Sequence, residues 1–167
     1  MPDYKGFFLN SPSRVVRLET FQLYHPSFTR TYYIVRNATR GLVANLENGA
    51  SITFEYYPVK IEKNGFVGDL DFGIDISYGD LGEIVPTELD RIRADGTSDV
   101  KPTIIYREYR SDDLSAPMMG PLLLQVKNFS FNREGATMQA AAPSLNINKT
   151  GITYSLSGPF RTLRSFL

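Results

Sequence analysis

The 167-residue chain contains no cysteine, no tryptophan and a single histidine, His25. Without cysteine, disulfides, thiolate catalysis and zinc–thiolate sites are all excluded. His25 precedes a proline in a predicted turn, where one imidazole makes neither a metal site nor a base held by a third group. We therefore interpret His25 as structural, and expect no catalytic residue, no metal and no cofactor.

Long apolar runs are also absent. Pro121–Leu124 (PLLL) is among the longest, and a membrane-spanning helix needs about 20 such residues. Residues 1–6 lack the apolar stretch of a secretory signal. These absences predict a soluble protein that is made in the cytosol and has no membrane partner. The length suits one domain with a single core.

Charges sum to zero but are unevenly distributed. Residues 1–40 carry six Lys and Arg against two Asp and Glu, residues 41–100 four against twelve, and residues 101–167 eight against four. A neutral chain argues against bulk nucleic-acid binding by phosphate neutralisation. An acidic centre between basic flanks suits electrostatic matching between copies or with other subunits. An ordinary solvated surface remains the simpler interpretation.

Alternating apolar and polar residues predict strands through most of the chain. Val15–Tyr24 and Thr31–Arg36 form a predicted hairpin around the His25–Ser27 turn. Asn48-Gly49 favours a two-residue hairpin turn between the alternating residues of Leu42–Leu46 and those of Ile52–Tyr56. The second strand is expected to run on to about Ile61 and to bend at Pro58. Further strands are predicted at Asp71–Tyr78, Thr103–Arg110, Leu122–Phe131 and Thr137–Ala142.

Only residues 83–94 show helical spacing, and Gly96 is a suitable stop. The prediction is a mainly β fold: a two-sheet β-sandwich or barrel of seven to eight strands, with one flanking α-helix (about 83–94) and extended N- and C-terminal arms. The predicted divisions are an N-terminal arm (1–13), one β-rich domain (14–145) and a C-terminal docking segment (146–167).

The acidic residues Asp69, Asp71, Asp75 and Asp80 admit active interpretations, as a calcium loop or a glycosidase carboxylate pair. The spacing fits neither, and strand alternation explains Asp71 and Asp75 as the wet face of a half-buried strand. Ser111–Asp113 suits a polar turn. Arg30–Arg36 and Tyr106–Arg110 interleave aromatic and basic residues, which could bind single-stranded nucleic acid or form strands with one buried face; neutrality favours the second.

The two termini are rich in apolar residues, which usually mark a docking surface when exposed. We predict that these residues insert into neighbouring molecules: Phe7, Phe8 and Leu9 near the start, and Phe160, Leu163, Arg164, Phe166 and Leu167 at the end. Large aromatics and arginines are the usual anchors of such contacts.

Several stretches resemble, in a consistent order, a family of short phage-encoded minor tail proteins of uncharacterised function. They are LETFQLYHPSF (18–28), LENGASITFEYYP (46–58), IVPTEL (84–89), YREYRSDD (106–113), PLLLQVKNFSF (121–131) and the closing PFRTLRSFL (159–167).

The resemblance implies a structural virion protein of a tailed bacteriophage, located at the tail tip, hub or connector. It also implies a tail-tube-like fold, made in the host cytoplasm and assembled as a homo-oligomeric ring that contacts other tail or connector proteins. Genomic DNA would pass through the ring without specific binding, with Asp69, Asp71, Asp75 and Asp80 facing the lumen and repelling phosphates.

Two other functions are open at this point. A receptor- or carbohydrate-binding β-sandwich on the tail exterior is the first, although sugar platforms favour the absent tryptophan. A carboxylate-based hydrolase is the second, and it would need a pair of acids in a cleft with one raised pKa.

Overall fold

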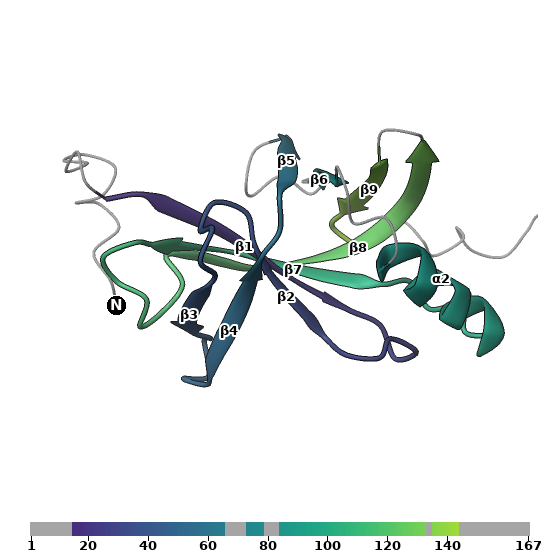
Figure 1. The fold of residues 1–167 in the computed structure, drawn as a ribbon, viewed down its shortest axis with the longest axis horizontal. Coiled ribbons are helices and arrows are strands. Elements are labelled where there is room, and N and C mark those ends of the chain that lie inside the picture. The colour runs from purple at the N-terminus through teal and green to yellow at the C-terminus, as the bar shows by residue number, and fades with distance from the viewer. Residues whose placement is uncertain (1–14, 66–72, 79–83, 133–134, 144–167) are drawn as a thin grey trace, which may run out of the picture.

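A computed structural model of the chain describes residues 15–65, 73–78, 84–132 and 135–143 (Figure 1). This part is mainly β with one helix, as predicted. Its elements in chain order are β1 (Arg17–Tyr24), β2 (Tyr32–Val35), β3 (Leu42–Asn45), β4 (Ser51–Tyr56), β5 (Val59–Asn64), β6 (Gly73–Tyr78), α2 (Ile84–Ala94), β7 (Thr103–Arg110), β8 (Met119–Asn132) and β9 (Gly135–Ala141). Helix α2 has 11 residues and is not long and apolar enough to cross a membrane.

All nine described strands belong to one mixed sheet, in the order β3-β4-β2-β1-β7-β8-β9-β6-β5. Strands β2 and β4 run parallel, and the other neighbouring pairs are antiparallel. Strands β3 and β5 form its two edges, so the sheet is open. Of the two predicted alternatives, the barrel does not form among the described residues, and their strands make one sheet where the sandwich would have two.

The predicted strand through Pro58 is in fact two strands. β4 ends at Tyr56 and β5 starts at Val59, and they lie near opposite edges of the sheet order. Proline cannot donate a ladder hydrogen bond and restricts the preceding residue, so it ends pairing readily. This division raises the strand count above the seven or eight predicted.

The sheet curls until its edge strand β5 lies against its centre. Lys63 of β5 forms an ion pair with Glu108 of β7, although β8, β9 and β6 lie between these strands in the sheet order. Register shifts interrupt the β7–β8 and β8–β9 pairings, and such bulges bend a strand. In Figure 1, β5, β6 and β9 lie on one side of the β1–β7 pair and the β3–β4 hairpin on the other.

The main core fills the concave side of this curl. Alternation within β6 points Ile74, Ile76 and Tyr78 inward, opposite the polar face predicted at Asp75, and Asp75 and Ser77 are half-buried. The other large contributors are Phe21, Leu23, Ile34, Ile61, Ile104, Tyr106, Leu124, Val126 and Met138. Each such side chain contributes roughly 1.5–3 kcal/mol when fully buried, so the core depends on strands from both ends of the sheet.

A second, smaller core lies on the opposite face, where the β3–β4 hairpin covers β1, β2 and β7. Its buried members are Leu18, Val35, Ala44, Phe54 and Tyr109. The Tyr109 hydroxyl donates to the Asn45 carbonyl at 3.0 Å, and burial raises the pKa of this phenol to about 12. The hairpin is thus held by packing and by one buried hydroxyl.

The β3–β4 hairpin turn differs from the predicted two-residue type. Gly49 has a positive φ of 79°, but Asn48 does not, and a two-residue type I′ turn needs both. The Gly49 amide donates to the Leu46 carbonyl and the Leu46 amide to the Ala50 carbonyl, each at 2.9 Å. The loop therefore has three residues with a left-handed glycine last, the next most common hairpin connection.

Helix α2 ends at Ala94, and Gly96, the predicted stop just beyond it, has a φ of 67°. The Gly96 amide donates to the Arg93 carbonyl at 3.2 Å and the Thr97 amide to the Ile92 carbonyl at 3.1 Å, the paired bonds of a Schellman motif.

Glu88 anchors the helix to the β1–β2 loop, because its carboxylate accepts bonds from the Thr29 amide at 3.1 Å and the Tyr32 hydroxyl at 2.6 Å.

Gly120 and Gly49 provide a test of how tightly the curled sheet is packed. Both have positive φ, but a Cβ on Gly120 would lie 2.5 Å from the Tyr106 carbonyl oxygen, whereas one on Gly49 would have no atom within 4 Å. We expect Gly120→Ala to lower the free energy of unfolding by about 2 kcal/mol more than Gly49→Ala. Urea denaturation measures both, and equal losses would contradict the close approach of β7 and β8.

Candidate functional site

Most residues predicted from the sequence to be functional lie outside the described part of the chain. These are Phe7, Phe8, Leu9, Phe160, Leu163, Arg164, Phe166, Leu167, Asp69, Asp71 and Asp80, and their roles stay predictions. Asp75 is described: it lies on β6, half-buried, and accepts a hydrogen bond from the Asn64 side chain at 2.9 Å. Its position agrees with the polar strand face that alternation indicates.

His25 is buried and has two neutral partners. The Ser27 amide donates to Nδ1 at 3.1 Å, and Nε2 lies 3.0 Å from the Val100 carbonyl. Since Nδ1 accepts, Nε2 carries the proton and donates to that carbonyl. The ring joins the β1–β2 loop to the segment before β7, which agrees with the structural role expected. No three metal-binding side chains gather anywhere in the described ranges.

The concave core contains a charged cluster that the sequence did not reveal. Glu19 of β1 and Glu108 of β7 are direct partners in the strand register, and their side chains are only 7% and 1% exposed. Both side chains point inward because Glu19 is two residues from Phe21 on β1 and Glu108 is two residues from Tyr106 on β7, so each pair shares one strand face. The Tyr106 hydroxyl lies 3.1 Å from Glu19 Oε1 and 2.7 Å from Glu108 Oε1.

Three cations surround these two carboxylates. Lys63 of β5 pairs with Glu108 and lies 3.5 Å from Glu19 Oε1. Arg36, just beyond β2, donates to Glu19 Oε2, while Arg17 lies 3.7 Å from Glu19 and 3.8 Å from Glu108. Every buried side-chain nitrogen or oxygen among the described residues has a hydrogen-bond partner. We call this set, with Tyr106, the carboxylate cluster.

The electrostatics of the cluster favour the ionised form of Glu19. Burial by itself raises the pKa of Glu19, but the hydrogen bond from Arg36 and the charge of Lys63 outweigh it, so the pKa lies below its usual value. Burial, then the charges of Glu108 and Glu19, raise the pKa of the Tyr106 phenol. A general acid needs a carboxyl with a raised pKa. Glu19 is therefore suited to holding strands together and lacks the raised pKa of a general acid.

A second ion pair, between buried Arg107 and exposed Glu47, lies on the opposite face of the sheet. Arg107 of β7 donates from Nε to Glu47 Oε1 at 2.6 Å and from Nη2 to Oε2 at 3.3 Å. Its Nη1 donates to Gln22 at 3.1 Å. Burial raises the pKa of Glu47, but the hydrogen bond and charge of Arg107, together with a backbone hydrogen bond, outweigh it, so the pKa lies below its usual value. This bidentate pair fixes the turn of the β3–β4 hairpin to the centre of the sheet.

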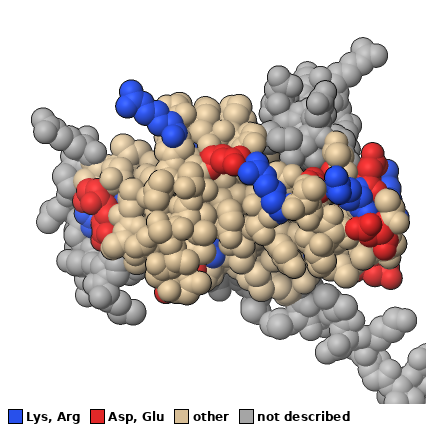
Figure 2. Space-filling view, turned by 60° about the horizontal axis from the view of Figure 1, so that its bottom comes forward, with Lys and Arg blue, Asp and Glu red and all other residues tan. Residues whose placement is uncertain are grey.

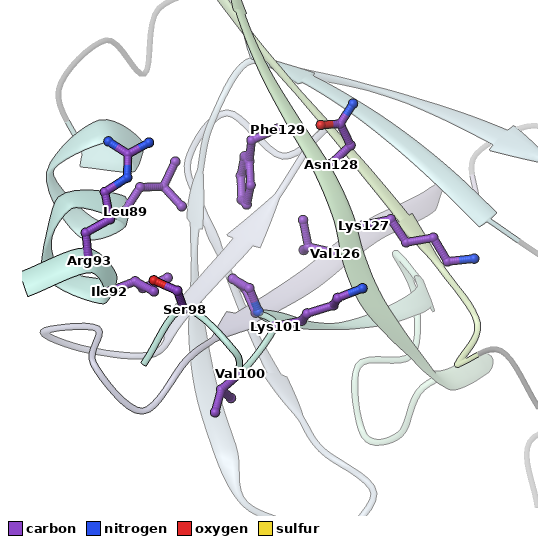
Figure 3. A pocket seen from close by; sticks show the side chains of 11 residues that line it. Leu89, Ile92, Arg93, Ser98, Val100, Lys101, Val126, Lys127, Asn128 and Phe129 are labelled. Carbon is purple, nitrogen blue, oxygen red and sulfur yellow. The ribbon is translucent and has the colours of Figure 1, made fainter. Parts of the chain in front are cut away.

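A groove of about 400 Å3 separates helix α2 from β8 (Figure 3). Leu89, Ile92, Val126 and Phe129 supply apolar surface, and Arg93, Lys101 and Lys127 supply positive charge. The remaining lining residues are Ser98, Val100, Pro102 and Asn128. Figure 3 shows Arg93 on the helix wall, Lys127 on the β8 side and Phe129 between them. Among the described residues that line this basic groove, none carries a carboxylate.

Sequence reasoning missed both the cluster and the groove. The available signal for the cluster was a glutamate at an inward position of an otherwise apolar strand face, as at Glu19 and Glu108. Nothing local linked these residues to Lys63, which is 45 positions from Glu108. The groove depends on how α2 packs beside β8, which strand and helix periodicity do not specify.

Residues 5–144 match the model of a protein family described as Domain of unknown function (DUF1833). The match covers most of the chain, so the chain belongs to this family. No curated protein matches it significantly.

Removing the Lys63 charge should weaken the closure of the sheet. Lys63→Met leaves Glu108 buried without its closest cation, which we expect to cost about 3 kcal/mol of unfolding free energy. Lys60→Met is the matched control on the same strand: Lys60 pairs with Glu62 at 2.5 Å on the exposed side, and should cost less than about 1 kcal/mol. Equal losses in chemical denaturation would mean that the cluster does not secure β5.

The cluster also predicts acid sensitivity. The folded-state pKa of Glu19 is depressed, so its contribution to stability is complete above the unfolded-state pKa and is lost as the pH falls through the folded-state value. Stability should therefore be nearly level from pH 8 to 6 and should fall below about pH 5.

Glu19→Gln should lower stability at pH 7 and reduce this acid slope by up to about 1.4 kcal/mol per pH unit. Glu62→Gln, an exposed change on β5, should leave the slope unchanged. Urea titrations at several pH values measure it, and identical slopes for Glu19→Gln and the unaltered protein would refute the prediction.

Proposed function

We propose that this chain is a structural virion protein of a tailed bacteriophage. In this role it is a ring-forming subunit of the tail tip, hub or connector, made in the host cytoplasm and joined there to neighbouring tail proteins. Several of its sequence stretches resemble minor tail proteins and occur in the same order, which suggests that the chain belongs to a phage tail. The shape and surface of the sheet support the role of assembly.

The observation that carries the proposal is an uncharged strip on the outer face of the sheet. Two successive cross-strand rows contain no charged residue. The first is Tyr33, Gln22, Ile105 and Leu123, and the second is Tyr24, Thr103, Gln125 and Ala141. We call these eight residues the neutral sheet face. Leu123 and Tyr24 are 55% and 46% exposed.

Exposed apolar side chains grouped on one flat surface usually mark a contact with another protein. Lone lysines or glutamates would oppose such a contact by their desolvation cost, and the two rows have none. Figure 2 shows one face of the molecule on which charged side chains stand in small groups within wide uncharged surface. A neighbouring subunit packed on the neutral sheet face would supply the second layer of the predicted two-sheet arrangement.

The apolar ends of the chain extend the same proposal. Phe7, Phe8 and Leu9 fall within the DUF1833 match, whereas Phe160–Leu167 lies beyond it. The first set would serve a contact shared by the family, and the second a contact particular to this chain. In a ring, acidic residues such as Asp75 facing the lumen would repel passing DNA.

Two variants test the proposal. Deletion of residues 159–167 and the substitution Leu123→Lys should both leave the β fold intact by circular dichroism. Both should weaken self-association or incorporation into particles about tenfold or more, because each removes or charges an apolar contact. Sedimentation velocity of the purified chain and cryo-electron microscopy of assembled particles provide the readouts.

Val43→Lys is the matched control, since Val43 is 58% exposed but lies on the β3–β4 hairpin, away from the neutral sheet face. It should assemble normally. Normal assembly of both test variants would argue that neither surface joins subunits. A purified chain that binds glycans on an array would favour the exterior receptor-binding function instead.

A further inference from the structure

The ion pairs of the described residues leave few cations without a partner. Nine of the twelve lysines and arginines in the described ranges lie within 4.0 Å of a carboxylate oxygen. The other three are Arg40, Lys101 and Lys127. Two of these three line the basic groove between α2 and β8, so unmatched positive charge is concentrated there.

The groove combines this charge with apolar surface. Ile92 and Val126 are buried in its floor, and Phe129 is half-buried beside them. Arg93 on the helix wall has one partner, Asp90 at 3.3 Å, and both side chains are largely exposed, so the pair is weak. A fitting occupant therefore presents carboxylates next to bulky apolar side chains.

The chain itself contains a segment of this composition. Residues 66–72 read FVGDLDF, with Asp69 and Asp71 alternating with Leu70 and Phe72, and with no lysine or arginine. It belongs to the most acidic third of the sequence. Its charge and its apolar content both complement the basic groove.

The strand register indicates that this segment serves another copy. Asn64 and Gly73 are register partners, so residues 65–72 join β5 to β6 in sequence. Through β9, the groove residues Val126 and Phe129 align with Ile74 and Ile76. Gly73, to which the segment is attached, is level with Gln125 and so lies on the far side of the Val126 row from Phe129. A segment of a second copy is free of this attachment.

We propose that residues 66–72 of one copy dock in the basic groove of a second copy, with Asp69 and Asp71 against Lys101 and Lys127. The contact is heterologous, because one surface inserts into a different one, and repeated heterologous contacts generate rings when the rotation closes. The inference rests on the proposed function, which supplies the ring. It assigns Asp69 and Asp71 to an interface and not to the lumen.

Charge reversal on each side tests the contact. The double variant Lys101→Glu/Lys127→Glu and the double variant Asp69→Lys/Asp71→Lys should each self-associate about tenfold more weakly than the unaltered chain in sedimentation velocity at low salt. An equimolar mixture of the two variants should recover association, because the reversed charges match again. Arg40→Glu is the control, since Arg40 is the third unmatched cation and does not line the groove.

Unchanged association of the groove variant, or a mixture that recovers nothing, would overturn the inference. If deletion of residues 159–167 still abolished assembly in that case, the proposed function would stand without this contact. If the unaltered chain is monomeric at all concentrations, a synthetic peptide of residues 65–73 is titrated onto it. Binding that is lost in Lys101→Glu/Lys127→Glu supports the docking, and absence of binding refutes it independently of any ring.

Discussion

The pairing of Glu19 and Glu108 with Lys63 is the interaction on which the curled sheet depends. It joins an edge strand to the sheet centre across the concave core, where a carboxylate without its cation would carry a large desolvation cost. Hydrophobic burial favours any compact packing of β5, β6 and β9 over β1 and β7. The ion pairs are directional, so they select one packing in which Lys63 meets both carboxylates. The apolar core supplies the free energy of folding, and the cluster supplies the specificity of closure.

On the opposite face of the sheet, apolar burial and an ion pair again have separate roles, at a smaller scale. The β3–β4 hairpin packs apolar residues on Tyr109 and Leu18, while the Arg107–Glu47 pair fixes the hairpin turn in place. Helix α2 is positioned by Glu88, which accepts bonds from the loop between β1 and β2. Each element that covers the central strands is therefore held by a carboxylate with a specific partner: buried Glu108 for β5, buried Glu88 for α2 and exposed Glu47 for the β3–β4 hairpin. The outer sheet face between them is left without charge, which makes it available for contact.

Sequence patterns predicted the parts of this fold that depend on local geometry. Alternation identified the inward set of β6, and Gly96 marked the helix end, because side-chain direction and positive φ are properties of a few neighbouring residues. The division at Pro58 and the three-residue loop at Gly49 were missed, since each depends on where the adjoining strands pair. The carboxylate cluster was missed for the same reason. Tyr106 and Glu19 are 87 positions apart, and only the curl of the sheet brings Lys63 between them.

Most lysines and arginines among the described residues already lie beside a carboxylate, and this has a consequence for recognition. Where most cations already have a carboxylate within reach, a new charged partner gains little by competing for them, because it must displace an existing pair of similar energy. Lys101 and Lys127 have no ion pair that a new partner must displace. They lie beside apolar surface, which a small anion alone would leave exposed to water. An acidic segment with large apolar side chains satisfies both surfaces at once. If a chain with zero net charge associates as proposed, its specificity depends less on its overall field than on the unmatched cations of its described part, Lys101 and Lys127.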